Sequence, residues 1–247
     1  MRSPLAILCT LALAAGAAAC GSDDEKKDAP GAQRGAATTA TRPATTATAP
    51  RPSEPPRCRR VAAPRPKPVR RLPRPTLRLD REKRYEAIVD TSCGPFTIAL
   101  DVRGSPRTAA SFVHLARRGF YDGTIFHRIV PGFVIQGGDP QASGQGGPGY
   151  SVVEAPPSGT RYTKGVVAMA KTEIEDPGTS GSQFYVVTAQ DAQLPAEYAV
   201  LGRVSSGQQV VDVIGVAPTD QANPDPRLRE RPVNPVVLRS IRIRERR

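Results

Sequence analysis

The stretch FHRIVPGFVIQGGDP, residues 126–140, is the most informative part of this sequence of 247 residues. It contains most of a short strand-like run, Ile125–Val130, and all of a second run, Phe133–Gln136. Pro131-Gly132 separates the two runs, and Gly/Pro pairs between strand-like runs are typical of turns. The stretch therefore predicts two short strands, with Arg128 in the first and Gln136 in the second.

Strand-like runs and turn residues continue on both sides of this stretch. Cys93-Gly94-Pro95 separates two runs in the pattern of a β-hairpin. Ser105-Pro106 opens a helix that Gly119 ends, and Ser206 is a candidate cap for a second short helix. Many short strands, two helices and no βαβ alternation predict a mainly β fold, a closed antiparallel eight-stranded barrel with helices at its ends. The other predicted strands are Tyr85–Asp90, Phe96–Asp101, Val166–Ala170, Phe184–Thr188, Ala199–Val204 and Val236–Ile243.

The formal net charge of +12 is unevenly distributed along the chain. Residues 51–84 carry thirteen basic and three acidic side chains, whereas residues 85–226 carry nine and fourteen. Eleven of the 26 prolines lie between Pro30 and Pro75, which favours extended chain over a packed core. The basic stretch is interrupted by proline and has no aromatic residue before Tyr85, so a nucleic-acid partner is not expected.

The N-terminal segment has the pattern of an export signal. Arg2 precedes an apolar run that is too short to span a membrane, and Ala17-Ala18-Ala19 fits a cleavage site before Cys20. Small residues before a cysteine resemble the lipobox of bacterial lipoproteins, although that family prefers leucine where Ala17 stands. We therefore expect a signal peptide over residues 1–19, a lipid on Cys20, a disordered tether over residues 20–84 and a folded domain over residues 85–247. The protein would then lie on the outer face of the cell membrane; an ordinary cleaved signal would leave it secreted with a free Cys20.

Three blocks in order along the chain carry a family resemblance. Residues 126–139 resemble the signature of the cyclophilin family of peptidyl-prolyl isomerases, close to F-H-R-x-I-P-G-F-x-x-Q-G-G-D. GSQFY, residues 181–185, is similar to its G-S-Q-F-F, and GVVAMA, residues 165–170, to its G-x-[LV]-[AS]-M-A. The resemblance covers about residues 85–243 and implies a cyclophilin-like barrel that accelerates rotation about X–Pro bonds.

The resemblance also assigns roles to individual residues. It makes Arg128 and Gln136 the catalytic residues, and Gln136 together with Gln183 the polar pair that orients the arginine and the substrate backbone. The backbone around Ala170 and Lys171 would form the edge against which a peptide lies. The apolar proline pocket would comprise Phe133, Val134, Tyr185 and Leu194, with Tyr198 where many members have histidine. Tyr185 and Lys171 also depart from the more usual Phe and Asn.

The chemistry of amide rotation explains why such a site needs no metal or cofactor. The barrier of about 18–20 kcal/mol comes from amide resonance, and no bond is broken during rotation. A catalyst must instead bind the twisted amide, whose prolyl nitrogen can accept a hydrogen bond from Arg128. His114 and His127 have no carboxylate at zincin spacing, so no metal site is expected. The glycine-rich Gly144–Gly149 lacks the end of a phosphate loop and is interpreted as a surface turn.

Two alternatives to an isomerase acting on exported proteins remain open from the sequence. The first is a non-catalytic module that only holds Pro-containing segments on a cyclophilin barrel, and the second is a polyanion-binding surface protein driven by residues 51–84. The partners expected for an isomerase are Pro-containing polypeptides and the membrane, reached through the lipid on Cys20 and the basic tether. The chain itself is expected to be monomeric.

The four cysteines suggest one disulfide. Cys9 would leave with the signal peptide and Cys20 would carry the lipid, which leaves Cys58 and Cys93. Two remaining thiols in an exported protein suit a single Cys58–Cys93 bridge, and two unpaired thiols are the alternative.

Overall fold

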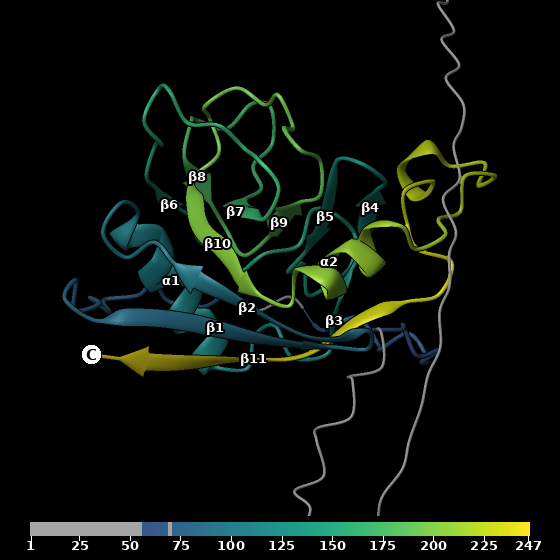
Figure 1. Cartoon of the computed structure of the whole chain (residues 1–247), viewed down its shortest axis with the longest axis horizontal. Helices are drawn as coiled ribbons and strands as arrows, with labels where there is room; N and C mark the ends of the chain where they lie inside the picture. The colour runs from purple at the N-terminus through teal and green to yellow at the C-terminus, as the bar shows by residue number, and fades with distance from the viewer. Residues whose placement is uncertain (1–55, 69–70) are drawn as a thin grey trace, which may run out of the picture. The chain divides into compact units, whose positions relative to one another are not determined.

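The computed structural model describes residues 56–68 and 71–247, and its main feature is a nine-stranded antiparallel sheet (Figure 1). In sheet order the strands are β3 (Thr124–Phe126), β11 (Val236–Arg246), β1 (Arg84–Thr91), β2 (Gly94–Leu100), β10 (Val200–Ser206), β7 (Val166–Met169), β9 (Phe184–Val187), β5 (Val134–Gly137) and β4 (Arg128–Val130). The predicted β-hairpin is present as β1 and β2, which pair from Glu86 with Ala99 to Thr91 with Gly94.

The sheet curves into a nearly complete barrel, because its two end strands follow one another directly in the sequence. Its two end strands, β3 and β4, are separated in sequence only by His127. The predicted single strand Ile125–Val130 is therefore two strands separated by His127, and the sheet has nine strands where eight were predicted. A second sheet of β6 (Val152–Val153) and β8 (Thr179–Ser180) was not predicted, because two-residue strands show no periodicity.

Two helices pack against the inner core, and in Figure 1 α1 (Pro106–Arg117) lies on the left and α2 (Gln208–Gly215) lies right of the centre. Helix α1 contributes Phe112 and Leu115 to the inner core, and α2 contributes Val211. Proline at the first position of α1 has a backbone angle φ already suited to a helix, as predicted. A 3₁₀ turn, η1 (Pro226–Leu228), precedes β11.

The start of α2 differs from the prediction by one residue. Gly207 is the N-cap instead of Ser206, with φ at +79°, in the left-handed region that favours glycine. A Cβ atom on Gly207 would lie 2.7 Å from the carbonyl oxygen of Pro95 and 2.8 Å from the Cα of Phe96. The close approach of this turn to the β1–β2 hairpin therefore requires glycine.

The described residues that precede β1, 56–68 and 71–83, form a segment without helix or strand that we call the strap. The sequence predicted a disordered tether over residues 20–84, of which residues 20–55 lie outside the described part of the chain. The strap, by contrast, belongs to the same compact unit as the barrel. Leu72, Leu77 and Leu79 pack against the inner core. Proline and arginine dominate the composition of this segment, and composition does not show the three spaced leucines, whose burial favours a packed segment.

Covalent and polar contacts also hold the strap on the barrel. A disulfide joins Cys58 to Cys93 of the β1–β2 turn, the pairing that the sequence predicts. Closing a loop of this sequence separation, 35 residues, stabilises a fold by roughly 3–4 kcal/mol through the unfolded chain. The amide of Lys67 donates to the carbonyl oxygen of Pro140 at 2.8 Å.

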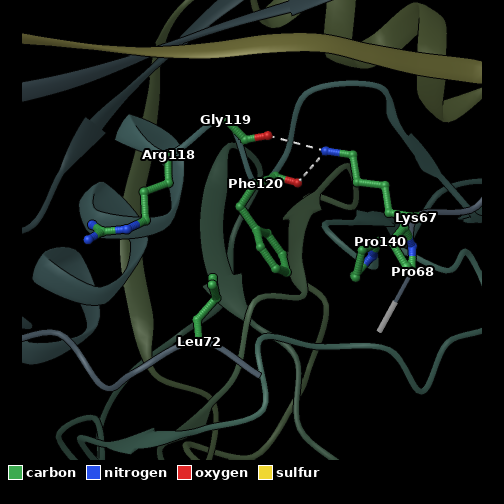
Figure 2. Close-up of a pocket in the computed structure, with 7 residues that line it drawn as sticks. All are labelled: Lys67, Pro68, Leu72, Arg118, Gly119, Phe120 and Pro140. Carbon is green, nitrogen blue, oxygen red and sulfur yellow. Dashed lines mark hydrogen bonds between the residues drawn. The ribbon is translucent and has the colours of Figure 1, made fainter. Parts of the chain in front are cut away.

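The side chain of Lys67 makes a further anchor (Figure 2). Its ammonium donates to the backbone carbonyl oxygens of Gly119 at 3.2 Å and Phe120 at 2.8 Å, just after α1. A cavity of about 520 Å³ lies at this contact, with Leu72 and Phe120 in its lining. The strap and the barrel therefore enclose space between them.

Within residues 56–68 and 71–247, no helix has the length and apolarity needed to cross a lipid bilayer. The expected signal peptide and Cys20 lie outside the described residues.

Candidate active site

The pleat of the sheet sorts neighbouring residues onto two faces. Ile129 and Ile135 are opposite one another on β4 and β5, and both belong to the inner core. Arg128 and Gln136 form the adjacent pair, so their side chains project from the outer face. The same row continues from Gln136 to Tyr185 on β9. Family resemblance and register thus place the expected catalytic arginine and glutamine on one surface.

A second apolar cluster covers this outer face. We call it the outer-face cluster; it consists of the buried Val134, Tyr162, Val166, Ala168, Tyr185 and Val187, with the partly buried Phe133, Ala170, Ala189, Ala192, Leu194, Tyr198 and Val200. All four residues expected to form the proline pocket belong to it, together with Ala170 and Tyr198. The structure therefore brings six predicted substrate-binding residues together from five separate segments.

Three tyrosines give the outer-face cluster its shape. The ring of Tyr198 meets those of Tyr162 and Tyr185 edge-on, with centroids 5.9 and 5.6 Å apart. The hydroxyl of Tyr162 donates to the carbonyl oxygen of Tyr198 at 2.7 Å and accepts from its amide at 2.9 Å. Sequence reasoning missed Tyr162, which lies outside every motif block, yet it fixes the backbone that presents Tyr198.

The hydroxyl of Tyr185 is buried and has no hydrogen-bond partner among the residues that the structure describes. Burial raises the pKa of Tyr185, and the neighbouring Tyr162 and Tyr198 raise it further, so the phenol stays neutral. An unpartnered polar group in an apolar cluster is costly. Tyr185 thus supplies an aromatic wall to the site, with a hydroxyl that the described residues do not use.

The two predicted glutamines bind one another at the edge of the cluster. The Gln136 side-chain amide donates to the side-chain oxygen of Gln183 at 3.0 Å. Gln183 in turn donates to the carbonyl oxygens of Gly144 and Gly146, at 2.9 and 3.0 Å. We call residues 144–149 the glycine loop, and this surface turn is connected to the site through Gln183.

Asp139 shapes the glycine loop from beneath. Its fully buried carboxylate accepts backbone hydrogen bonds from Gln141, Ser143, Gly144 and Gly146, at 2.6–3.1 Å. Burial alone would raise the pKa of Asp139, but these donors and the charge of His127 outweigh it, and the pKa is lowered. A Cβ atom on Gly146 would lie 1.9 Å from the Asp139 carboxylate, so this turn depends on glycine.

Arg128 is held by an acidic residue that sequence reasoning did not find. The Nε of Arg128 donates to the carboxylate of Glu230 at 2.5 Å, and both side chains are about one-third exposed (34% and 40%). The carbonyl oxygen of Glu230 accepts from the amide of Ile129 at 2.8 Å, which fixes the acidic residue beside β4. Because only Nε is engaged among the described residues, the Nη groups are available to a ligand on the outer face.

Lys171 has a different place from the one that its motif position suggests. Its side chain is only 3% exposed, and its ammonium pairs with Glu197 at 3.1 Å. The ammonium also donates to the carbonyl oxygens of Thr172 and Glu175, and it lies 5.5 Å from the centre of the Tyr198 ring. The side chain therefore joins two loops around the cluster, and only the backbone of Lys171 remains for a peptide.

Within the described ranges, no group of three or more His, Cys, Asp or Glu side chains is arranged to hold a metal ion. His127 is buried, and its two ring nitrogens have no hydrogen-bond partner within residues 56–68 and 71–247. The ring of His114 lies 3.1 Å from the guanidinium of Arg118. The site that the structure does show combines an aromatic, apolar surface with an arginine and two amides at its edge. Such a surface can bind an apolar ring and donate hydrogen bonds to the group attached to it.

Comparisons with known proteins identify this arrangement. The family model "Cyclophilin type peptidyl-prolyl cis-trans isomerase/CLD" matches residues 87–243. The peptidyl-prolyl cis-trans isomerase CYP18-2 of Arabidopsis thaliana is 36% identical over 157 residues, which cover 62% of this chain and 90% of that protein. A peptidyl-prolyl cis-trans isomerase-like 1 of Rhizopus delemar is 41% identical over 142 residues, or 56% of this chain and 84% of that protein.

Solved structures are similar over the same part of the chain. A cyclophilin-type peptidyl-prolyl cis-trans isomerase of Cryptosporidium parvum has a TM-score of 0.58 at 28% identity, covering 65% of this chain and 98% of that one. A structure of the same protein in the presence of the dipeptide Ala-Pro has a TM-score of 0.57 at 29% identity, covering 64% and 98%. With a family model that matches more than half of its length, the chain belongs to the cyclophilin-type peptidyl-prolyl cis-trans isomerases, and its activity is the isomerisation of X–Pro bonds.

Proposed function

We propose that the isomerase acts on exported proteins and that the outer-face cluster, with Arg128 at its edge, is where it does so. The observation that carries the assignment of the site is the row from Arg128 through Gln136 to Tyr185 across three strands. This row places a partly engaged guanidinium next to an apolar aromatic surface. A proline ring has a complementary shape and polarity for that surface, and its amide nitrogen is the group that needs a donor.

In the proposed mechanism, the proline ring packs against Phe133, Val134 and Leu194, which fixes the ring while the rest of the peptide turns. As the amide twists, resonance is lost and the prolyl nitrogen becomes an acceptor. An Nη group of Arg128 then donates to that nitrogen, an interaction that the planar amide does not offer. A hydrogen bond from a charged donor contributes about 1.5–3 kcal/mol, which corresponds to roughly a tenfold to 200-fold increase in rate.

Glu230 has a positioning role in this mechanism. Its carboxylate holds the Nε edge of the guanidinium and so restricts the directions in which the Nη groups point. Preorganising a donor avoids the reorganisation that a solvated arginine would need at the moment of reaction. Gln136 occupies the neighbouring position of the same row, where its amide group can bind the substrate backbone.

A coupled prolyl-peptide assay of the full chain tests the assignment of Arg128. We expect Arg128→Ala to lower kcat/KM by at least about tenfold with an unchanged circular dichroism spectrum. Arg128→Lys keeps the charge but loses the forked donor, so we expect it to restore little of the activity. An Arg128→Ala variant with unchanged kcat/KM would contradict the role of the arginine and favour a module that only holds Pro-containing segments.

We propose export and membrane attachment on the basis of the sequence alone. Residues 1–19 have the pattern of a signal peptide, and Cys20 would carry the lipid. Mass spectrometry of the mature protein decides between a lipidated Cys20 and an ordinary cleaved signal. A Cys20→Ser variant is expected to move from the membrane fraction to the medium, and an unmodified N-terminus at Met1 would contradict the proposal.

The enzyme is proposed to act as a monomer, and light scattering of the purified chain tests this.

The polyanion-binding alternative rests on the basic charge of residues 51–84. Retention on heparin together with an absence of isomerase activity would favour it over the proposed function.

A further inference from the structure

A groove lies beside the outer-face cluster, and part of its lining comes from the strap instead of the barrel. Its volume is about 690 Å³, and Gln136, Ala170 and Gln183 of the proposed site line one part of it. The glycine loop lines another part, and Arg71 and Arg74 of the strap line a third. A polypeptide bound at the site therefore has space next to it in which two strap arginines face the ligand.

The strap is fixed at this point by contacts on both sides of the backbone. The amide of Leu72, between the two arginines, donates to the carbonyl oxygen of Pro148 at 2.8 Å, while its side chain packs on the inner core. Gly149 lies so close that a Cβ atom on it would be 2.9 Å from the Cα of Arg71. With φ at +83°, Gly149 has the left-handed conformation and the small size that let the strap pass here.

Proline reinforces this placement. Pro73 and Pro75 flank Arg74, and a proline fixes its own φ and restricts the residue before it to extended conformations. Arg74 is therefore presented from a stiff backbone, which reduces the entropy that a bound ligand would have to offset.

The charges in the groove favour an anionic ligand. The ammonium of Lys171 is already paired with Glu197. The Glu175 carboxylate, the acidic group in the lining, accepts from the amide and hydroxyl of Thr172 at 2.7 and 2.9 Å. Arg71 and Arg74 are exposed and form no ion pair or hydrogen bond with any of the residues that the structure describes. Their two positive charges are thus the ones available to a ligand in the groove.

We propose that Arg71 and Arg74 extend the substrate site, and that they select polypeptides with a carboxylate side chain close to the isomerised proline. The inference rests on the proposed location of the active site in the outer-face cluster. Guanidinium groups bind carboxylates through two parallel hydrogen bonds, which makes arginine the suitable residue for this selection. The strap, which lies outside the family-matched residues 87–243, would thereby give the barrel a substrate preference of its own.

The test is a series of proline peptides in which glutamate, glutamine or lysine is placed singly at each of three positions on either side of the proline. The full chain is expected to isomerise the glutamate peptide about fivefold faster than the glutamine peptide, in kcat/KM, at one or two adjacent positions. The preference should fall as salt is raised, because exposed ion pairs are screened. In an Arg71→Gln/Arg74→Gln variant the ratio is expected to approach one, and in Arg71→Glu/Arg74→Glu lysine is expected to be preferred.

Arg60 and Arg78 provide a matched control, because they are exposed strap arginines that do not line the groove. Arg60→Gln/Arg78→Gln removes the same charge and should leave the glutamate preference intact. Equal rates for glutamate and glutamine peptides at every position, or an equal loss of preference in the control variant, would overturn the selection by Arg71 and Arg74 while leaving the proposed site in place. If no peptide of the series were isomerised, the proposed site would fail, and this inference with it.

Discussion

The two faces of one sheet differ in what their side chains do. Along β9, Phe184 points into the inner core, where its ring meets those of Phe112, Tyr121 and Phe126 edge-on at 5.7–6.1 Å. Its neighbour Tyr185 lies on the outer face among the residues of the proposed site. The inner rings are enclosed on all sides, whereas the outer cluster is open along its edge.

This difference separates stability from activity within single strands. On β4, Ile129 is fully buried in the core, while the adjacent Arg128 is partly exposed and carries the proposed chemistry. The alternation of a strand thus lets consecutive residues serve the fold and the function. Substitutions on the two faces should therefore affect different measurements.

The largest expected effect is on the inner face. Phe184→Ala removes a fully buried ring and is expected to lower the free energy of unfolding by about 3–5 kcal/mol, measured by denaturant titration. Phe133→Ala, its counterpart on the outer face, removes a partly buried ring. It should lower the free energy of unfolding less than Phe184→Ala does, and it should lower kcat/KM more. The distinction between the faces would fail if Phe133→Ala destabilised the protein as much as Phe184→Ala while leaving kcat/KM unchanged.

Acid should weaken the fold at the break between β3 and β4. Burial lowers the pKa of His127 from an ordinary value of 6.5 to about 4. The charge of Asp139 raises this pKa, whereas the charges of Arg231 and Arg128 lower it further. The unfolded chain therefore binds the proton first, and stability present above pH 6.5 is lost as the pH falls towards 4. The difference amounts to about 3 kcal/mol.

Denaturant unfolding between pH 7 and 4 measures this loss. His127→Asn is expected to reduce the slope in that window. His114→Asn measures the separate contribution of the other histidine, whose pKa is also lowered, by burial and by the charge of Arg118. The lowered pKa of Asp139 places its own contribution below this range. A wild-type stability that is constant from pH 7 to 4.5 would refute the buried neutral histidine.

On the outer face, Glu230→Gln tests the positioning of Arg128. The substitution keeps the shape and removes the charge that holds Nε, so we expect kcat to fall about threefold to tenfold with little change in KM. Because the Glu230 side chain is partly exposed, stability should change by less than about 1 kcal/mol. Glu230→Asp should recover part of kcat, and an unchanged or increased kcat in Glu230→Gln would argue against positioning.

The smallest expected effect is a gain in the stability of the fold. Tyr185→Phe leaves the ring and removes a buried hydroxyl that has no hydrogen-bond partner in the described part of the chain, so it should stabilise the fold by about 1 kcal/mol. Thermal unfolding measures the change, and isomerase activity should be retained because the apolar wall is intact. A destabilised variant would indicate that the hydroxyl has a partner, such as a bound water.

The motif blocks allowed much of the site to be predicted, but they did not predict the site residues that lie outside them. Arg128, Gln136 and Tyr185 lie within the blocks, and strand register alone brings them into one row. Glu230 lies in a loop about a hundred residues away, and Tyr162 lies in a connection without a motif. Their contacts depend on how the chain returns to the barrel, which local patterns do not encode.

The strap shows the same limit at the level of the fold. Its arginines and prolines indicated an extended chain, and the described residues of the strap contain no helix or strand. That composition could not show which surface an extended chain contacts. The position of Leu72 against Pro148, and hence of Arg71 and Arg74 in the groove, depends on a barrel loop far away in the sequence.

Nuclear Overhauser effects between the full chain and a short Ala-Pro-containing peptide show whether a substrate proline binds on the outer-face cluster. We expect contacts from the proline ring to Phe133, Tyr185 and Leu194, and a shifted Arg128 Nε resonance. Contacts from the ring to Phe120 and Leu72, in the cavity under the strap, with none to the outer-face cluster, would contradict it.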